Sequence, residues 1–315
     1  MTQAPLYISE TAVAGKLRWD AVVAALRAGH KLARAEIKDA MVGGGDRSFL
    51  NRAAWIAGLG GGVKSVTVFP ENPYREEKLP TVQGVFLFFD DKTGALKAII
   101  DGPLITKWKT AADSILGAQF LARKDVSKVL VIGAGALASA LIEAYAHAMP
   151  QVDEIVVWAR NEQKAQAAVK AAAIGNVKVV SVGGSLESYV RATDIIVTAT
   201  SSSTPVLNGD WVRPGSHVDL VGAFRADTRE ADDKLIVKAK IFVDSRDTTI
   251  DHIGDLVIPI ATGVIQRANV LGDFYDLESG ADGRRSQDEI TVFKNGGGAH
   301  LDLMTAKVIY DAVTS

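Results

Sequence analysis

Apolar residues near the beginning of the chain recur at helical spacing. Between residues 10 and 37 they are Val13, Leu17, Val22, Val23, Leu26 and Leu32. A repeat of three to four residues places such side chains on one face of a helix, and Thr11 or Asp20 could cap a helix start. The pattern therefore predicts helical structure over residues 10–37.

The pattern then changes to that of β-strands. Runs of β-forming residues occupy 63–69 and 84–89, and the polar turn 90–94 leads into a third run at 96–100. Such runs around a turn predict an antiparallel sheet. Helical spacing returns over 104–123, so we expect the first 120 residues or so to form an α+β domain.

From residue 128 onward, short apolar runs alternate with helical segments. Strands are expected at 128–132, 154–158, 177–181 and 194–199, separated by helices at 136–149, 161–174 and 185–191. This alternation is typical of a doubly wound parallel sheet. Further apolar runs at 216–221 and 241–243 would extend the sheet, and a last helix is expected at about 299–314.

Composition narrows the classes of protein and of chemistry. With 315 residues, 48% of them hydrophobic, the chain is long enough for two domains. A net charge of −2 argues against a nucleic-acid partner. The chain has no cysteine, which excludes disulfides and thiolate catalysis. We expect a cytoplasmic protein, because the N-terminus does not resemble a signal peptide and no apolar run approaches the roughly 18 residues of a membrane span.

The segment KVLVIGAGALA, residues 128–138, is the chemically most informative motif. A buried strand, a Gly-x-Gly-x-x-Ala turn and a helix start follow each other, as in Rossmann domains that bind a dinucleotide pyrophosphate. Gly133 would allow the tight turn, Gly135 the approach of the phosphate and Ala138 the packing of helix on strand. An ordinary glycine turn is the alternative, and the flanking strands and helices argue against it.

The end of the second strand indicates which dinucleotide is bound. NAD-binding chains carry an acidic residue there for the ribose 2′-hydroxyl, whereas this chain has Arg160. A guanidinium suits a 2′-phosphate, so we expect NADP(H) to be preferred and NAD(H) to be possible. Alternatively, Arg160 only contacts solvent or stacks on the adenine.

Several ordered motifs outside this unit resemble the ornithine cyclodeaminase/mu-crystallin family. They include GVKSVTVFPENP at 62–73, LPT at 79–81, DG at 101–102, KTAA at 109–112, VDSR at 243–246, GDL at 254–256 and EITVFK at 289–294. The resemblance extends from about residue 45 to the end of the chain. It implies an α/β protein in which a Rossmann domain (121–298) accompanies a discontinuous α+β domain (1–120 with 299–315) for substrate binding and dimerisation.

The resemblance also implies a substrate class, because most activities of the family concern small α-imino or α-amino acids. They include reduction of cyclic ketimines such as Δ1-pyrroline-2-carboxylate and Δ1-piperideine-2-carboxylate, cyclisation of ornithine, and alanine dehydrogenation. Lys64 matches the family's substrate-binding lysine, and a partly buried lysine can relay a proton to an imine. A surface lysine on an apolar strand is the alternative interpretation.

Two departures from the family pattern concern the binding of the substrate carboxylate. Lys109 occupies the position of an arginine that binds the carboxylate in the family, and a lysine lacks the planar guanidinium. Arg52 stands where the family has an apolar residue, so we expect Arg52 to supply the missing guanidinium. Arg47 is a second candidate, with a surface role as its alternative.

A third departure concerns acid–base chemistry. Phe224 replaces an aspartate of the ornithine cyclodeaminases, and phenylalanine cannot transfer protons, which argues against cyclodeaminase activity. Asp227, three residues further on, is the candidate substitute. In the glycine-rich turn 295–299, Gly297 could approach the nicotinamide, and His300 is a candidate proton donor or a solvent-facing helix residue.

These observations predict an NAD(P)H-dependent imino-acid reductase. The expected catalytic residues are Lys64, Asp227 and His300, and Arg52, Lys64 and Lys109 are expected to bind the substrate. The expected cofactor-contacting residues are Gly133, Gly135, Ala136, Leu137, Arg160, Thr198, Ala199, Thr200 and Gly297. The alternatives are an NAD⁺-dependent cyclodeaminase or amino-acid dehydrogenase and an NADPH-dependent binding protein. We expect a homodimer without a membrane partner, and no metal, since the five histidines lack close ligand spacing.

Overall fold

The structure is a computed structural model of the chain that describes residues 4–44, 47–172, 174 and 177–315. The contacts within the chain divide it into two compact units. Unit 1 contains residues 1–109 and 298–315, and unit 2 contains residues 110–297. The expected boundary at residue 120 differs from this division, because residues 110–121 of helix α3 (Gly102–Leu121) belong to unit 2, where Gly117 lies against Phe293.

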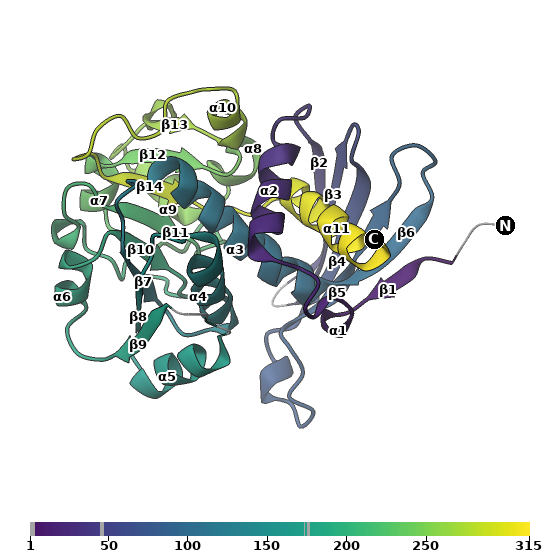
Figure 1. Cartoon of the computed structure of the whole chain (residues 1–315), viewed down its shortest axis with the longest axis horizontal. Coiled ribbons are helices and arrows are strands. Elements are labelled where there is room, and N and C mark those ends of the chain that lie inside the picture. The colour runs from purple at the N-terminus through teal and green to yellow at the C-terminus, as the bar shows by residue number, and fades with distance from the viewer. Residues whose placement is uncertain (1–3, 45–46, 173, 175–176) are drawn as a thin grey trace. The chain divides into compact units, whose positions relative to one another are not determined.

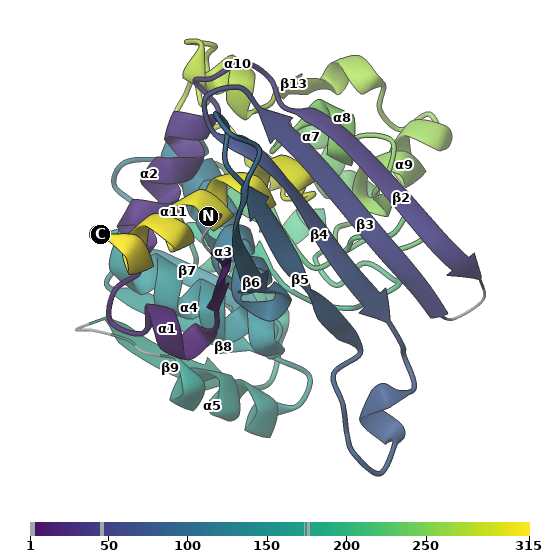
Figure 2. The same cartoon turned by 90° about the vertical axis from the view of Figure 1, so that its right-hand side faces the viewer.

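Unit 1 is built on a six-stranded sheet in the order β1-β6-β5-β4-β3-β2. All neighbours in it are antiparallel except β1 and β6. The strands are β1 (Leu6–Ile8), β2 (Glu36–Gly44), β3 (Arg47–Ile56), β4 (Gly60–Val68), β5 (Val82–Phe89) and β6 (Leu96–Asp101). Figure 2 shows β2 to β5 side by side.

One face of this sheet is covered by helices of the same unit. Helices α1 (Glu10–Val13), α2 (Trp19–Gly29) and the C-terminal α11 (Ala299–Thr314) belong to it, and α11 packs on α2, β3 and β4. Gly29 allows α2 to approach α11, because a Cβ atom there would lie 2.5 Å from the sulfur of Met304. The C-terminal helix therefore belongs to the core of the N-terminal unit, as the resemblance implied.

The helical structure expected over residues 10–37 is confirmed for the two helices α1 and α2, but it was wrong at the C-terminal end of that range. Gly15, with φ +72°, follows the short α1, and neither Thr11 nor Asp20 is an N-cap, since Ser9 and Arg18 precede the two helices. Residues 36 and 37 begin β2 instead, and β2 and β3 were not predicted. The side chain of Leu32, which was assigned to the helical face, is exposed.

Unit 2 contains an eight-stranded sheet that is parallel throughout, in the order β13-β12-β14-β11-β10-β7-β8-β9. This confirms the expected doubly wound α/β fold. The strands are β7 (Lys128–Ile132), β8 (Glu154–Trp158), β9 (Lys178–Val182), β10 (Ile195–Thr198), β11 (His217–Leu220), β12 (Lys240–Val243), β13 (Val270–Gly272) and β14 (Thr291–Lys294). Strand β14 was not predicted, although it lies between β11 and β12.

Helices lie along both faces of this sheet (Figure 1). They are α4 (Ala136–Ala148), α5 (Glu162–Ala171), α6 (Leu186–Arg191), α7 (Asp233–Lys238), α8 (Arg246–Thr249), α9 (Gly254–Ala261) and α10 (Phe274–Glu278). Residue 173 of the helix expected at 161–174 lies outside the described residues. Val129 to Ile132 of β7 are fully buried, and each such side chain stabilises the fold by about 1.5–3 kcal/mol.

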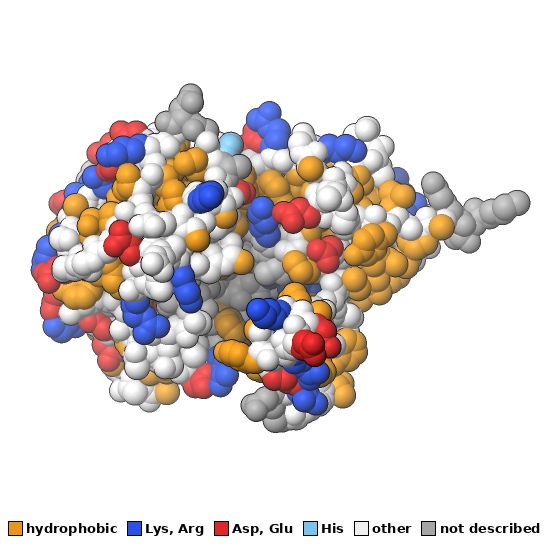
Figure 3. Space-filling view, turned by 90° about the horizontal axis from the view of Figure 1, so that it is seen from below, with side chains coloured by type: hydrophobic (Ala, Val, Ile, Leu, Met, Phe, Trp, Pro, Cys, Tyr) orange, Lys and Arg blue, Asp and Glu red, His pale blue; other side chains and the backbone are white. Residues whose placement is uncertain are grey.

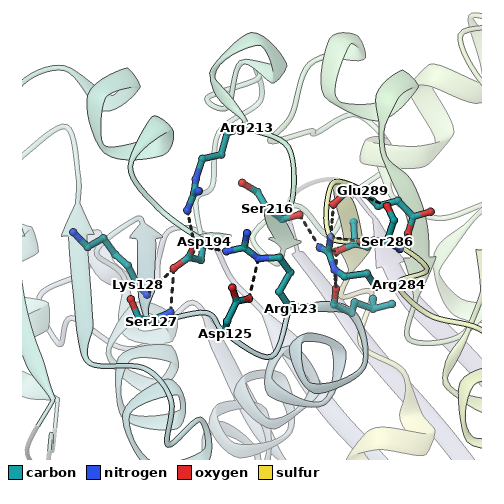
Figure 4. A network of polar contacts seen from close by, with 12 residues as sticks. Arg123, Asp125, Ser127, Lys128, Asp194, Arg213, Ser216, Arg284, Ser286 and Glu289 are labelled. Carbon is teal, nitrogen blue, oxygen red and sulfur yellow. Dashed lines mark hydrogen bonds and ion pairs between the residues drawn. The ribbon is translucent and has the colours of Figure 1, made fainter.

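Charged side chains connect the loops at the amino ends of the central strands (Figure 4). Asp194 accepts hydrogen bonds from the backbone N–H groups of Ser127 and Lys128, at 3.0 and 3.1 Å, and from the guanidinium groups of Arg123 and Arg213. Burial opposes ionisation of Asp194, but these donors together lower the pKa of its carboxyl group. The network holds the amino ends of the neighbouring central strands β7 and β10 in place.

Candidate functional site

The turn between β7 and α4 has the geometry that a pyrophosphate site requires. Gly133 has φ +132°, and a Cβ atom there would lie 2.4 Å from the carbonyl oxygen of Ala199. Gly135 is the N-cap of α4 without a side-chain hydrogen bond, and a Cβ atom there would meet nothing within 4 Å. The N-terminus of α4 thus presents backbone N–H groups toward open space, which suits an anion.

A groove of about 650 Å³ begins at this turn and follows the carboxyl ends of β7, β8 and β10. Its lining residues are Gly133, Ala134, Gly135, Trp158, Ala159, Arg160, Asn161, Lys164, Leu186, Ala199, Thr200, Ser201, Ser202, Val206 and Trp211. Two of them, Arg160 and Lys164, are cationic, and among the described residues none of the lining side chains is acidic. The groove has the place, size and charge for a dinucleotide with phosphate groups.

The predicted cofactor residues are distributed unevenly around this groove. Gly133, Gly135, Arg160, Ala199 and Thr200 line it, and Ala136 and Leu137 form the first turn of α4. Thr198 is buried behind the groove, where its hydroxyl donates to Glu230.

Glu230 is an organising residue that the sequence analysis missed. Its carboxylate accepts hydrogen bonds from Thr198 Oγ1 and Thr200 Oγ1, both at 2.8 Å, and from the backbone N–H groups of Thr200 and Gly222, at 2.7 and 2.6 Å. The side chain is fully buried. It therefore fixes the loops that follow β10 and β11, including groove residue Thr200.

Gly297 lies in a turn that another buried acid holds. Asp244, at the end of β12, accepts hydrogen bonds from the backbone N–H groups of Gly296 and Gly297, at 3.1 and 2.6 Å. Gly297 has φ +64°, a conformation that suits glycine. This turn precedes α11.

Unit 1 contains a buried cluster of two lysines and one aspartate, which we call the cation cluster. Lys64 of β4 lies 2.9 Å from Asp302 of α11, and Lys109 of α3 lies 3.0 Å from the same carboxylate. All three side chains are buried, with 7%, 4% and 0% of their residue surface exposed. Strand β4 and the helices α3 and α11 thus bring together residues that are up to 238 positions apart.

Burial changes the acid–base properties of this cluster. It lowers the pKa of Lys64 to about 8, and the neighbouring Lys109 and Arg52 act in the same direction, whereas Asp302 opposes them. Burial alone would raise the pKa of Asp302, but Lys109 and Lys64 hold it well below its usual range. Lys64 can therefore gain and lose a proton near neutral pH.

Arg52 lies next to the cation cluster, directly opposite Lys64 in the pairing of β3 with β4. Its guanidinium also forms an ion pair with Asp39 of β2 at 2.8 Å. Arg47, the second candidate, is at the other end of β3, where it pairs with Glu71 at 2.5 Å and lies over the ring of Phe69. It is five positions away from Arg52 along the strand, roughly 17 Å.

His300 is fully buried in the first turn of α11, so the alternative of a solvent-facing residue was wrong. Its ring meets that of His30 of α2 edge-on, with centroids 5.5 Å apart. Burial lowers the pKa of His300 well below its usual value, and His30 and Lys109 lower it further. The imidazole is thus held neutral at physiological pH.

Asp227 and Phe224 belong to the loop after β11. The carboxylate of Asp227 is exposed and forms a two-point ion pair with Arg225, at 2.9 and 2.7 Å. The preceding residue, Ala223, is fixed by its backbone, because its N–H donates to Glu230 and its carbonyl oxygen accepts from Lys294 Nζ. Phe224 itself is 74% exposed. The structure thus gives Asp227 a charged partner within its own loop.

Asp302 is the most important residue that sequence reasoning missed. The sequence contained one signal for it: Asp302 is a carboxylate within the largely apolar helical segment AHLDLMTA (299–306). All residues of this segment are buried, so Asp302 cannot be an ordinary surface acid.

In the described chain, no three His, Asp or Glu side chains are grouped so that they could hold a metal ion. Nor, among the same residues, does any helix have the length and apolarity to cross a membrane.

The parallel sheet, the glycine turn and the groove of a size for a dinucleotide define a Rossmann-type dinucleotide-binding protein with a second, cation-bearing unit. The chain belongs to the ornithine cyclodeaminase/mu-crystallin family, whose profile matches residues 53–315.

Its relatives include reductases and a dehydrogenase. A Delta(1)-pyrroline-2-carboxylate reductase of Paracoccus denitrificans is 50% identical, and the match covers 98% of this chain and 97% of the relative. The solved structure of the Thermococcus litoralis Delta(1)-pyrroline-2-carboxylate reductase with NADH and L-proline has a TM-score of 0.88 at 28% identity, covering 98% of this chain and 97% of the other. An archaeal alanine dehydrogenase dimer with bound NAD has a TM-score of 0.88 at 27% identity, covering 98% and 95%.

Proposed function

We propose that this protein is a reductase that converts a cyclic ketimine carboxylate, Δ1-pyrroline-2-carboxylate or Δ1-piperideine-2-carboxylate, into the L-amino acid with NAD(P)H. The observation that carries the proposal is the cation cluster of this chain. The 50% identity to a Delta(1)-pyrroline-2-carboxylate reductase supports it. Two buried ammonium groups around one carboxylate leave an excess of positive charge, which suits an anionic substrate.

In this proposal, Lys64, Lys109 and Arg52 bind the substrate carboxylate. Lys64 and Lys109 each have N–H donors beyond those that face Asp302, because an ammonium group carries three. Arg52, opposite Lys64 in the sheet, supplies the guanidinium. The fixed carboxylate then orients the C=N bond, which is the main contribution that positioning makes to the rate.

Lys64 is also the proposed proton source. With a pKa of about 8 it is mostly protonated at pH 7 and can keep the imine nitrogen protonated. A protonated imine is the better hydride acceptor. We assign no proton transfer to His300, whose neutral ring suits a role in shaping the site. Asp227, paired with Arg225, is not needed for this chemistry.

A reduced nicotinamide dinucleotide, when bound, supplies the hydride. The glycine turn, Arg160 and the loops held by Glu230 would hold it in the groove of unit 2. We propose a preference for NADPH, because Arg160 and Lys164 can pair with a 2′-phosphate and no described lining residue offers a carboxylate to a 2′-hydroxyl.

We further propose that the protein is a cytoplasmic homodimer that associates through the outer face of the six-stranded sheet. Val42, Phe49 and Trp55 on that sheet have 63%, 43% and 41% of their surface exposed. Hydrophobic side chains gather on the surface of unit 1 at the right of Figure 3. Exposed apolar surface of this kind marks an interaction site.

The test follows NADPH and NADH oxidation with both ketimine carboxylates, and ammonia release from L-ornithine with NAD⁺ in parallel. Ketimine-dependent oxidation that is faster with NADPH supports the proposal. Ammonia release from ornithine without ketimine reduction would instead identify a cyclodeaminase. Tight binding of the ketimine without oxidation of the cofactor would identify a binding protein.

A further inference from the structure

Asp302 is the acidic residue of the cation cluster. Its carboxylate, fully buried in the first turn of α11, faces both lysine ammonium groups, and Lys64 Nζ is within 3.1 Å of both of its oxygens. The elements packed around Lys64 contribute these charged or titratable groups: Asp302 and His300 from α11, Lys109 from α3, Arg52 from β3 with its partner Asp39 from β2, and His30 from α2.

The charges of this set do not cancel. Arg52 lies outside the cation cluster and is paired with Asp39 at 2.8 Å, which offsets its charge only in part, because Arg52 still acts on Lys64 and Asp302; the buried His300 stays neutral. Lys64 and Lys109 contribute two positive charges, and Asp302 removes one of them. Within the cation cluster itself one net positive charge remains in a buried environment, where charge imbalance is costly and a single bound anion restores the neutrality of these three groups.

We infer that Asp302 is a positioning residue that also sets substrate charge: it fixes the two ammonium groups and leaves the cluster with one positive charge, so that the cluster accepts a substrate with one carboxylate and discriminates against a dicarboxylate. This inference rests on the proposed function, because it concerns the same carboxylate-binding groups. It goes beyond that function by naming which imino acids are excluded and the residue responsible.

The physical reason is the long range of Coulomb forces in a dry site. A second carboxylate of the ligand would meet a cluster already neutralised by the first, at distances of several ångströms from Asp302. Removing the Asp302 charge adds one positive charge, which favours each further ligand charge by a factor of about ten or more at an effective dielectric constant near 20. The ratio of dicarboxylate to monocarboxylate affinity is therefore the diagnostic quantity, whereas a general loss of structure would weaken both ligands alike.

The experiment measures that ratio by calorimetry, with pyrrole-2-carboxylate and pyrrole-2,5-dicarboxylate as planar probes that differ by one carboxylate. The full-length protein is used as wild type, D302N, D302E and K109M. D311N is the matched control, because Asp311 is an acid of the same helix that pairs with Lys307 outside the cluster. Thermal unfolding of each variant reports its fold.

At a pH where the titration described below shows Lys64 of D302N to be still protonated, we expect D302N to raise the ratio about tenfold, and D302E and D311N to leave it at the wild-type value. K109M removes a positive charge and should lower the ratio, so the inference remains testable even where D302N does not fold. The double variant D302N/K109M again has one net charge and should return to the wild-type ratio. A ratio that is the same in D302N, K109M and the wild type would overturn the inference.

A second readout follows the titration of Lys64 by NMR of isotope-labelled lysine, with K64R to assign its signal. Loss of the Asp302 carboxylate should move the Lys64 titration to lower pH, and an unmoved titration would count against the positioning role. Neither measurement needs turnover. Correct ratios in a protein that does not reduce ketimines would therefore refute the proposed function alone, and active wild type with unchanged ratios would refute only the inference about Asp302.

Discussion

Lys64 illustrates how burial gives an ordinary side chain a new role. Its ammonium group lies in a site with 7% of the residue exposed, beside a second lysine and an arginine, and only Asp302 favours its charge. The balance holds its pKa at about 8, between the values of a free lysine and a histidine. A group of this kind can bind a carboxylate and deliver a proton in the same pH range.

The pH dependence of reduction tests this role. Lys64 is protonated below its pKa of about 8, so kcat/KM for the ketimine should be highest below pH 8 and should fall as the pH rises through that value. K64R keeps its charge to much higher pH and should move the fall to more alkaline pH, even if the maximum is lower. K92R, an exposed lysine in the turn before β6, is the control. The same alkaline fall in K64R and the wild type would contradict the assignment.

Arg160 carries the prediction on cofactor choice. The side chain is exposed at the end of β8 and lines the groove, so its guanidinium can reach a 2′-phosphate without distorting the fold. R160A should weaken NADPH about ten- to a hundredfold, the effect of losing a charge-assisted contact of 1.5–3 kcal/mol, and leave NADH nearly unchanged. R191A, an exposed arginine of α6 outside the groove, should change neither. Equal losses for both cofactors would mean that Arg160 contacts the part that they share.

At the scale of elements, the β7–turn–α4 unit separates two uses of glycine. Gly133 has a positive φ and lies against the backbone of Ala199, whereas Gly135 has φ −84° and faces open space. Any side chain at residue 133 strains the fold, but at residue 135 it only occupies the space into which a phosphate would move.

The two alanine variants should therefore differ in kind. G133A should lower the free energy of unfolding by about 1–3 kcal/mol and weaken cofactor binding as well. G135A should retain the wild-type unfolding midpoint and weaken the cofactor at least tenfold. Urea denaturation and fluorescence titration with NADPH measure the two quantities. Wild-type affinity in G135A would show that the cofactor does not approach this turn.

Strand β11 contains two buried groups whose ionisation is displaced in opposite ways. Burial lowers the pKa of His217 to about 3, with Arg284 adding to the effect. Burial raises the pKa of Asp219 to about 7, although Ser114 and Lys294 oppose it. Both side chains are uncharged in the native state over much of the range between those values.

Each of these shifts makes the free energy of unfolding depend on pH, and the two dependences have opposite signs, so they partly cancel. Below pH 6.5 the unfolded chain protonates His217 and the native state does not, so this group makes stability fall with falling pH. Between about pH 4 and 7 the native state keeps Asp219 protonated and the unfolded chain does not, so this group makes stability fall with rising pH.

D219N removes the second effect. Its free energy of unfolding should rise with pH between 4 and 6.5, by up to about 1.4 kcal/mol per unit, where the wild type stays nearly flat. Urea denaturation at half-unit intervals measures both curves, and D153N, a substitution at an exposed position before β8, is the control. Parallel curves for D219N and the wild type would show that Asp219 titrates alike in both states.

Sequence pattern captured elements that carry their own signal. The strands and helices from 128 to 199 are each buried on predictable faces, so they were expected within a few residues of their observed ends. Strands β2 and β3 were not predicted. Strand β2 is largely exposed along its length, and its sequence, which includes Met41, Val42 and two glycines, does not alternate clearly between apolar and polar residues. A strand at the edge of a sheet gains its structure from pairing with its neighbour, which local sequence does not reveal.

The candidate site was predictable only in part for a related reason. Lys64 and Lys109 stand in motifs and could be chosen from the sequence, but Asp302 is linked to them only by the fold, across 238 residues from Lys64. Glu230 likewise gains its importance from five backbone and side-chain donors, which lie at the end of β10 and on the loops after β10 and β11. Residues that position others carry no local pattern of their own.

At the scale of the whole molecule, the six-stranded sheet is covered unevenly. Ala54, Ile56, Val66, Phe86 and Phe88 of its strands are buried, with α11 packed on β3, β4 and β5. Val42 and Phe49 are partners in the pairing of β2 with β3, so their side chains lie on the same face, and both are exposed. An antiparallel sheet with an exposed apolar face is stabilised when a second copy covers that face.

This surface predicts that the protein is a dimer in solution and that charge on the sheet face separates it. V42E and F49E should each shift the molecular mass found by sedimentation from two chains toward one, because a carboxylate buried in a dimer interface without a partner costs several kcal/mol. V237E is the matched control: Val237 of α7 has the same 63% exposure as Val42 but belongs to the other unit. A dimer that survives both sheet variants, or one that V237E disrupts, would place the interface elsewhere; a dimer sensitive only to the sheet variants would assign unit 1 a second task beside holding the cation cluster.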